Sequence, residues 1–322
     1  MANILAFDVG GTKIAGGIVD ETGRILEQQV VPSGGSEGRQ RVLEQLFALG
    51  DRLLQTYPGQ VDAVGIGTAG EVDPKLGTIT SATQSIPNWT GTALRDAAQH
   101  RWLVPCFVDN DGNAAALGEQ LFGAGRGCEH FVYICLGTGV GGAVVDQGKL
   151  LRGKANYAAA LGHMTIAVGG RMCSCGGQGC LEAYASGTAL THRAQEDAIC
   201  SDSQQLFRMA AEGHAQASLL VAETAYYLGV GLANLVNLFD PEKIVVGGGL
   251  AAAGPVLLRP AEEVMNQRVL PGLVDTVEVV EAHLGANAGL VGAAALALLG
   301  LDVLPSHASE CDCGISAGLS QG

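Results

Sequence analysis

Short apolar runs separated by glycine-containing turns open the chain, and this pattern predicts strands. The first three runs are residues 4–7, 14–19 and 25–31. Apolar residues then recur at helical spacing at Val42, Leu46, Leu49 and Leu53. That spacing predicts a helix with one apolar face, and the run at residues 61–66 predicts a further buried strand.

The order of elements then partly repeats. The predicted elements are a helix near residues 93–100, a strand at 104–108, a helix at 113–119, a strand at 131–136 and a returning strand at 142–146. A strand, a glycine turn and a second strand therefore occur in each half of the chain. This arrangement indicates two α/β domains that face each other across a cleft.

Longer elements follow towards the end of the chain. A long apolar helix is predicted at residues 219–239, a strand that ends in glycines at 243–249, and a helix of small residues at 288–299. We expect an N-terminal domain at residues 1–118 and a larger C-terminal domain at 119–287. The helix at 288–300 is expected to pack back on the N-terminal domain.

The end of the chain, residues 301–322, is typical of a disordered tail because it is rich in glycine and serine. Its Cys311 and Cys313 resemble part of a metal site but have no partner histidine nearby. A tail without a metal is therefore the favoured interpretation.

The charge balance excludes some partners. The 322 residues carry a net charge of −14, and the pI is about 4.8. Nucleic acids and anionic membrane surfaces need clustered Lys and Arg, so neither is expected as a partner. An acidic protein that binds a nucleotide must use backbone N–H groups and a divalent cation, and the 48 glycines suit that requirement.

The chain also carries few signs of export. Its first residues lack the basic segment and apolar core of a signal peptide. We expect no apolar run to approach the roughly 20 residues that a membrane helix needs. The nine cysteines are odd in number and unevenly placed, which argues against a disulfide framework. A reduced, cytoplasmic protein is expected.

Three glycine turns, each at the end of a predicted strand, are candidate phosphate cradles. Their residues are Gly10, Gly11, Thr12 and Lys13; Gly137, Thr138 and Gly139; and Gly247 and Gly248. Glycine lets backbone N–H groups approach phosphate oxygens. No turn matches a Walker loop or a Rossmann fingerprint, so the signal lies in the combination. The third turn also offers a flat surface for an adenosine.

Two carboxylates accompany these turns. Asp111 follows Asn110 at a strand-to-helix junction, where a carboxylate points into a cleft and can take a proton from a substrate hydroxyl. Asp8 ends the first strand, where it can hold Mg²⁺ directly or through water, although a turn-capping role is equally compatible with its position. A base beside phosphate cradles suggests phosphoryl transfer from a nucleotide to an alcohol.

A histidine and three cysteines form a candidate zinc site. They are His163, Cys173, Cys175 and Cys180, in a glycine-rich loop at residues 163–180. Three thiolates and one imidazole make a closed tetrahedral site, so the zinc is expected to be structural. The alternative is three ordinary reduced cysteines and a loop histidine, which the glycine-rich surroundings disfavour.

These residues together resemble the ROK family, which includes sugar kinases and repressors. The resemblance runs from residue 4 to about residue 299 and includes the block from Cys173 to Glu182, Asn110-Asp111 and the segment that ends at Gly70. It implies an actin/hexokinase-like (ribonuclease H-like) two-domain α/β fold with an interdomain cleft for ATP and Mg²⁺.

The resemblance also implies roles for individual residues. Asp111 would be the general base on a sugar hydroxyl, usually that on C6. Asn110, Glu182 and Gly70 would lie in the sugar site, and His163 would bind zinc with one nitrogen and contact the sugar with the other. Homodimers are usual among similar proteins.

Two departures from the family pattern affect the choice of sugar. The family usually reads Ala-Gly-Glu-x-Gly-His where this chain has residues 158–163, so Ala160 replaces a glutamate that grips the sugar. The family also often has Asn where Gln84 and Ser85 lie. A buried hydroxyl that loses such a partner costs about 1–3 kcal/mol. Room beside Ala160 would suit an N-acetyl group.

Three functions therefore remain open. The leading one is an ATP-dependent kinase of a hexose or N-acetylhexosamine. A catalytically impaired sugar-binding protein is the second, because of Ala160. A sugar-responsive regulator is the third, but the first predicted strand begins near residue 4 and leaves no room for a preceding DNA-binding segment.

Overall fold

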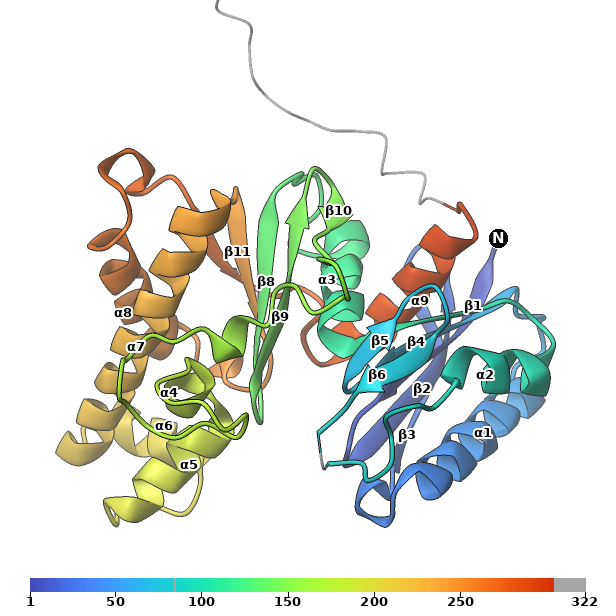
Figure 1. Cartoon of the computed structure of the whole chain (residues 1–322), viewed down its shortest axis with the longest axis horizontal. Coiled ribbons are helices and arrows are strands. Elements are labelled where there is room, and N and C mark those ends of the chain that lie inside the picture. The colour runs from blue at the N-terminus through green and yellow to red at the C-terminus, as the bar shows by residue number, and fades with distance from the viewer. Residues whose placement is uncertain (84, 304–322) are drawn as a thin grey trace, which may run out of the picture.

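The computed structural model describes residues 1–83 and 85–303. Cys311, Cys313 and the predicted tail beyond residue 303 lie outside the described residues, as does Gln84. The described chain forms two five-stranded mixed sheets and a small two-stranded sheet (Figure 1). The two large sheets stand side by side, with helices on their faces, which agrees with the predicted α/β class.

The first large sheet has the strand order β3-β2-β1-β4-β7. Its strands are β1 (Asn3–Val9), β2 (Lys13–Asp20), β3 (Ile25–Pro32), β4 (Ala63–Thr68) and β7 (Cys106–Asn110). β1 runs antiparallel to β2 and parallel to β4, and β7 is parallel to β4. The carboxyl ends of β1, β4 and β7 therefore meet at one edge, which places Asp8 and Asn110 at the same end of the sheet.

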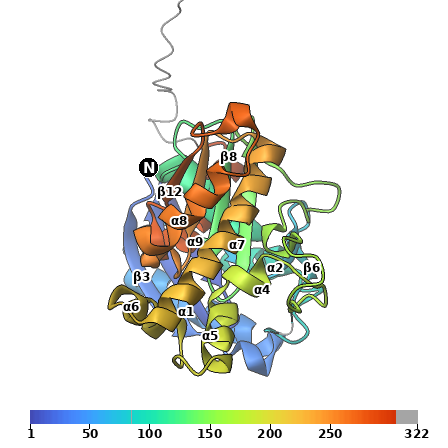
Figure 2. The same ribbon diagram turned by 90° about the vertical axis from the view of Figure 1, so that its left-hand side faces the viewer.

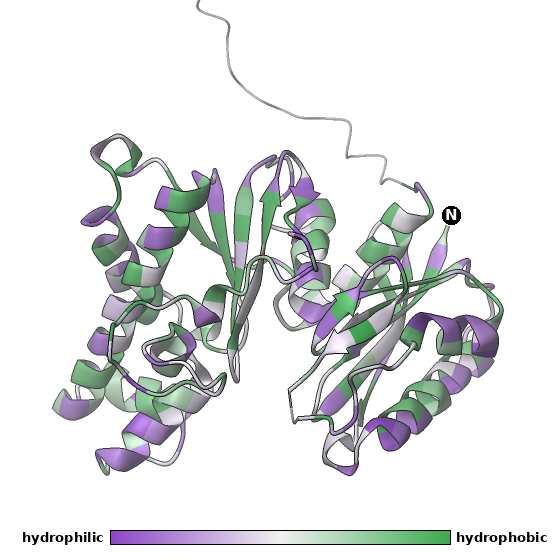
Figure 3. Cartoon of the chain, in the orientation of Figure 1, coloured by the Kyte–Doolittle hydropathy of each residue, from purple (hydrophilic) through white to green (hydrophobic). Residues whose placement is uncertain are grey.

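Alternate residues of β1 face two different cores, as strand geometry requires. Leu5 and Phe7 pack with α1 (Arg39–Thr56) and α2 (Leu94–Trp102), whereas Ile4 and Ala6 pack with α9 (Ala288–Gly300). In Figure 3, α1 and α2 carry hydrophilic residues beside their apolar ones, while α9 is mostly hydrophobic. A helix that is apolar all round fits burial between packed layers.

The second large sheet has the order β10-β9-β8-β11-β12. Its strands are β8 (Phe131–Leu136), β9 (Val140–Asp146), β10 (Lys149–Leu150), β11 (Lys243–Gly247) and β12 (Glu278–Glu281). One face packs on α7 (Ala215–Phe239), which in turn packs on α8 (Pro255–Asn266); Figure 2 shows both helices on the side that faces the viewer. α4 (Glu182–Ala185), α5 (Gly187–Glu196) and α6 (Ser203–Ala211) complete this layer.

Helix α3 (Asp111–Phe122) lies between the two sheets. Ala115 and Ala116 pack against the second sheet, and the same helix crosses α9 at close range. A Cβ atom on Gly292 would lie 2.1 Å from the Ala114 carbonyl oxygen, so the two backbones meet without side chains between them. The predicted division between residues 118 and 119 falls inside α3 and stays a prediction.

Three features of the fold differ from the expectations. α7 is long and apolar enough to cross a membrane, although no such run was expected, and 61% of its most apolar stretch is buried inside the fold. The expected lengths of several elements also shift: β7 ends at Asn110 and α3 begins at Asp111, two residues before the predicted helix. The small sheet of β5 (Glu71–Asp73) and β6 (Thr78–Ser81) was not foreseen.

Candidate functional site

A cleft of about 1980 Å³ lies between the two halves of the molecule. Most of the residues singled out in the sequence line it. They are Asp8, Gly10, Gly11, Thr12, Lys13, Gly70, Asp111, Gly137, Thr138, Gly139, Cys173, Glu182, Gly247 and Gly248. All three glycine turns and both carboxylates therefore share one cavity.

Asp111 occupies the first position of α3, at the end of β7. Its Oδ1 accepts a hydrogen bond from the Gly112 N–H at 2.8 Å. Asn110 caps the helix, because its Oδ1 accepts from the N–H groups of Gly112 and Asn113 at 2.9 and 3.2 Å. A helix N-terminus carries partial positive charge, so this position stabilises a carboxylate and fixes its direction.

The environment of Asp111 suits a proton acceptor. Its side chain keeps an accessible surface in the cleft, yet protein atoms surround it because the cleft is deep. This burial, followed by the nearby charge of Asp8, raises the pKa of Asp111 to about 7. A base with a pKa near the working pH is the most effective kind. The Gly112 hydrogen bond opposes the shift.

Asp8 sits near the end of β1, facing the same cleft. Burial raises the pKa of Asp8, and the charge of Lys13 opposes that rise. α9 approaches closely here: a Cβ atom on Gly289 would lie 2.4 Å from Asp8 Oδ2. The charge of Asp8 also raises the pKa of Asp111, so a cation held by Asp8 would offset negative charge in this part of the cleft.

The first glycine turn connects β1 to β2. The Gly10 N–H donates to the Lys13 carbonyl oxygen at 3.0 Å, which closes the turn. The neighbouring backbone at Gly35 approaches so closely that a Cβ atom there would lie 2.1 Å from the Gly11 oxygen. The turn is therefore held from behind while Gly11 and Thr12 remain at the surface of the cleft.

The second glycine turn, between β8 and β9, faces the start of α5. Gly187 donates to the Gly137 carbonyl oxygen at 2.8 Å, and Thr188 donates to that of Thr138 at 3.3 Å. Ser186 caps α5 by accepting from the Ala189 N–H at 3.0 Å. Since helix N-termini attract anions, α5 adds favourable potential to this cradle. The sequence reading missed this helix.

The third glycine turn ends β11. Gly248 has a φ of +87°, and a Cβ atom there would lie 2.5 Å from the Leu136 carbonyl oxygen. Only glycine fits both demands. The turn thereby lies flat against the end of β8, beside the second turn.

Glu182 links the second turn to the cysteine-rich loop. Its Oε2 accepts from the Val140 N–H at 3.0 Å, and its Oε1 accepts from the Ser174 hydroxyl at 2.7 Å. The carboxylate is thus anchored on two sides while it lines the cleft. A shift of the cysteine loop would move Glu182 with it.

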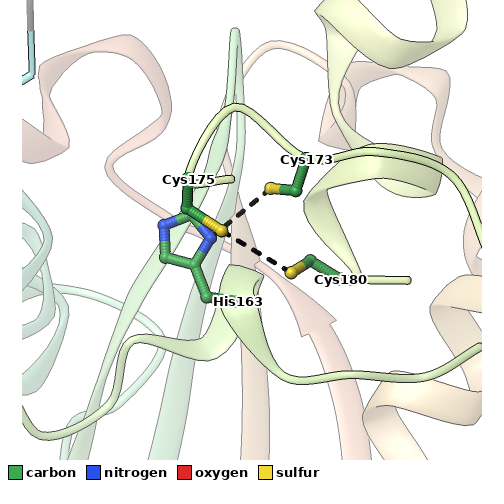
Figure 4. A group of neighbouring side chains, drawn as sticks. All are labelled: His163, Cys173, Cys175 and Cys180. Carbon is green, nitrogen blue, oxygen red and sulfur yellow. Dashed lines mark hydrogen bonds between the residues drawn. The ribbon is translucent and has the colours of Figure 1, made fainter. Parts of the chain in front are cut away.

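His163, Cys173, Cys175 and Cys180 converge, as their sequence spacing predicted (Figure 4). Their ligand atoms all lie within 4.8 Å of one another. The sulfur atoms of Cys175 and Cys180 are 3.8 Å apart, and Cys173 Sγ lies 3.7 Å from His163 Nδ1. A tetrahedral ion with bonds of about 2.3 Å to sulfur would separate two sulfurs by about 3.8 Å.

Four of the predicted residues do not line the cleft: Asn110, His163, Cys175 and Cys180. His163, Cys175 and Cys180 instead point towards one another in the candidate zinc site. Asn110 lies behind Asp111, where its Nδ2 donates to the Gly70 carbonyl oxygen at 3.0 Å in addition to the helix cap. Its sugar contact, implied by resemblance, stays a prediction.

The sequence reading missed a buried charge next to the base. Asp109 is completely buried, and its Oδ2 lies 2.7 Å from Arg152 Nη2 of the opposite half. Its Oδ1 accepts from the Asn110 N–H and from Asn113 Nδ2 at 2.8 and 3.0 Å. Asn156 Nδ2 donates to the Val72 carbonyl oxygen at 2.8 Å. The segment after β10 is thereby tied to β7 and β5.

Two further residues are buried close to α3. Cys128 is buried because it packs with the core that includes Phe131. Glu119 is fully buried. Its carboxylate accepts from the N–H groups of Ala124, His283 and Leu284 and so ties two loops to α3.

Comparisons with known proteins agree with the sequence resemblance. Residues 4–299 match the ROK family. The chain is 34% identical to a glucokinase of Thermotoga maritima over 91% of this chain and 96% of that protein. It is 28% identical to a xylose repressor of Caldicellulosiruptor bescii over 96% of this chain and 81% of that protein.

A solved structure is similarly close. It is that of a ROK family glucokinase from Streptomyces griseus in complex with glucose and AMPPNP, with a TM-score of 0.80 and 36% identity. The match covers 91% of this chain and 98% of that one. The two-lobed fold, the cleft with its three glycine turns and the cysteine-rich loop thus occur in a chain that belongs to the ROK family.

Proposed function

We propose that this protein is an ATP-dependent sugar kinase that phosphorylates a hydroxyl group of a hexose or N-acetylhexosamine, with C6 the expected position. The observation that carries the proposal is the position of Asp111: it begins α3 in a cleft shared with three glycine turns. The named activity of the glucokinase relatives supports it.

In the proposed reaction, Asp111 takes the proton of the sugar hydroxyl as the oxygen attacks the γ-phosphorus of ATP. A new phosphorus–oxygen bond forms, the bond to the β-phosphate oxygen breaks, and ADP leaves. The Gly112 N–H and the start of α3 orient the carboxylate. The backbone N–H groups of the glycine turns hold the phosphates, because the cleft lining offers few cations.

Asp8 is proposed to hold Mg²⁺, alone or through water. When bound, the ion would neutralise charge on the phosphates. Asp8 fits this role because its carboxylate is largely buried and faces Asp111 in the cleft, where the local excess of negative charge requires a cation.

A structural zinc ion is proposed for His163, Cys173, Cys175 and Cys180. The donor set and the distances of 3.7 and 3.8 Å fit a closed tetrahedral site. The ion would fix the loop that carries Ser174, the hydrogen-bond donor to Glu182. Zinc would therefore act on the sugar site through the position of Glu182.

The sugar is proposed to contact Glu182 and Gly70, with Asn110 and His163 as further contacts implied by the family. Ala160 is exposed and offers no hydrogen bond at the position of the family's glutamate. An N-acetylhexosamine is therefore as good a candidate as glucose. We also propose a cytoplasmic homodimer that uses only sugar and nucleotide as small-molecule partners.

An ADP-release assay over a panel of hexoses, hexosamines and their N-acetyl forms tests the kinase. The expected result is turnover with at least one sugar, dependent on ATP and Mg²⁺, and no turnover for Asp111→Asn. No turnover above background with any sugar, although the protein binds one, would favour the second candidate, an impaired sugar-binding protein, for which Ala160 is the motivating observation.

A further inference from the structure

A second cavity lies on the opposite side of α3 from the cleft. Residues 111, 112 and 115 of α3 line the cleft, whereas residues 117, 120 and 121 line this other cavity of about 650 Å³. Its remaining walls come from β7, α9, α2 and the β5–β6 turn in the first half, and from the β9–β10 hairpin and Arg152 in the second. We call it the rear pocket. Its volume is in the range of small-molecule sites.

The rear pocket combines apolar walls with cations. Phe107, Leu121 and Leu299 contribute apolar surface, and Arg95, Lys149 and Arg152 contribute the charges. None of the described residues that line it is acidic. In a chain with 18 basic and 32 acidic residues, such a grouping favours an anion.

Part of this positive charge is available to a ligand. The Lys149 side chain is exposed, and no ion pair involves it among the described residues. Arg95 uses its terminal nitrogens on the carbonyl oxygens of Lys75 and Pro74, but its buried Nε has no hydrogen-bond partner. An acceptor in the pocket would satisfy a donor that is otherwise left unpaired.

Arg152 connects the rear pocket to the base. Its Nη2 lies 2.7 Å from the buried Asp109 carboxylate, whose other oxygen accepts from the Asn110 N–H beside Asp111. An anion that draws Arg152 into the pocket leaves Asp109 with less compensation, and a buried charge in that condition is destabilising. The same segment continues from Arg152 to the exposed Ala160 and the zinc-ligand candidate His163.

We propose that the rear pocket binds a small organic anion with an apolar body, such as an amphipathic carboxylate or sulfonate, and that this binding slows phosphoryl transfer. The pocket has walls from both halves, so its occupant favours the arrangement of the halves that fits it over others. The regulatory part rests on the proposed kinase activity, and the binding part does not.

The probe for binding is 8-anilinonaphthalene-1-sulfonate, whose fluorescence rises in apolar surroundings. It is titrated onto the full chain in the presence of saturating ATP analogue and Mg²⁺, which keeps it out of the nucleotide site. We expect one site per chain. Complete displacement of the probe by the nucleotide would overturn the proposal, because the probe would then occupy the cleft.

Variants of one exposed lysine localise the probe. Lys149→Glu reverses the charge at the pocket, and Lys149→Met removes it while it keeps the apolar stem. We expect Lys149→Glu to weaken binding about tenfold and Lys149→Met to weaken it less. Lys154→Glu makes the same charge change at another exposed lysine that does not line the pocket. Equal effects of the two Glu variants would overturn the site.

Turnover supplies the second readout. We expect the probe to lower kcat severalfold without competing with ATP, and Lys149→Glu to abolish this inhibition while leaving the basal kcat unchanged. Inhibition that is purely competitive with ATP, or probe binding without any effect on turnover, would overturn the regulatory role. A chain without turnover in the absence of probe would contradict the proposed kinase instead, while the fluorescence titration would still test the pocket.

Discussion

The strand-to-helix junction at Asn110 and Asp111 and the segment at residues 156–163 lie on opposite halves of the molecule and differ in how well they fit the family pattern. At the junction, Asn110 caps α3 and Asp111 accepts from the Gly112 N–H. In the segment, Asn156 and Ala159 adopt left-handed φ values of 61° and 63°. Ala159 stands where the family usually has glycine.

This difference suggests that proton transfer and sugar recognition depend on different parts of the site. Proton transfer needs one carboxylate in a fixed direction, and the junction provides it without strain. Sugar recognition needs a set of partners that matches one substrate, and the alanine at position 160 offers no side-chain hydrogen bond for such a set. An enzyme can keep its chemistry while the choice of substrate changes, because different residues supply the two.

The largest expected effect is at the junction. Asp111→Asn keeps the shape of the side chain but removes the proton acceptor, so we expect kcat to fall about 10²–10⁴-fold. The variant should unfold at no lower temperature than the wild type at pH 8, because it removes a carboxylate charge that the surroundings of Asp111 disfavour. Steady-state kinetics and thermal unfolding measure both, and near wild-type kcat would rule out Asp111 as the base.

Loss of the proposed zinc should act on the other half. Cys175→Ser removes one ligand candidate, and we expect at least a tenfold lower kcat/KM for the sugar with little change in KM for ATP, because Glu182 loses a fixed anchor. Metal analysis should find one zinc per wild-type chain and less in the variant. Cys106→Ser, at a buried cysteine outside the cluster, is the control. Wild-type protein without zinc would contradict the prediction.

A substitution in the segment tests substrate choice. Ala160→Glu restores the family's carboxylate, and we expect it to raise kcat/KM for glucose relative to N-acetylglucosamine about 10- to 100-fold. Ala160→Gln is the matched control, since it adds a similar volume without a charge. An unchanged ratio of kcat/KM for glucose to that for N-acetylglucosamine in Ala160→Glu would show that position 160 does not contribute to sugar selectivity.

The pH dependence sharpens the description of the base. Burial raises the pKa of Asp111 to about 7, so the active carboxylate form is present above this pH and is lost as the pH falls below it. We expect kcat/KM for the sugar to rise with pH through this range. The charge of Glu71 contributes to the shift, so Glu71→Gln should move the rise to lower pH by a fraction of a unit. A profile that is flat from pH 6 to 8 would contradict both.

The smallest effect concerns the strained backbone. Ala159→Gly relieves the left-handed φ of 63°, and we expect the free energy of unfolding to rise by about 1 kcal/mol or less, because greater freedom of the unfolded chain offsets part of the gain. Ala158→Gly is the control at a neighbour without a positive φ, and it should destabilise. Chemical denaturation measures the change. A destabilised Ala159→Gly would show that no strain is relieved.

Local signals explain which parts of the structure were predictable. Apolar spacing in residues 42–53 predicted a helix, and the glycine turns after β1, β8 and β11 predicted strand ends and the lining of the cleft. Both signals are local in sequence. The cluster of candidate zinc ligands was also foreseen, since its four residues, one histidine and three cysteines, occur close together in sequence. β7 and α3 were foreseen with shifted ends, because the Asn110 cap decides the start of the helix.

The contacts that escaped prediction join distant residues. Asp109 pairs with Arg152 across the two halves, and no local pattern marks either residue. The rear pocket likewise needs β7, α3, α9 and the β9–β10 hairpin to be placed together. The helix that became α7 was foreseen, but not that it is long and apolar enough to cross a membrane; 61% of its most apolar stretch is buried inside the fold.

The glycine crossing of α3 and α9 has a mechanical consequence. Asp111 begins one of these helices, and Gly289 near the start of the other touches Asp8. Because the two backbones are in direct contact, no deformable side chains lie between the helices. Asp8 and Asp111 are therefore both held by a rigid pair of helices. We expect that a movement of the second sheet would bring the bound triphosphate closer to the two carboxylates. The distance between Asp8 and Asp111 would stay constant during that movement.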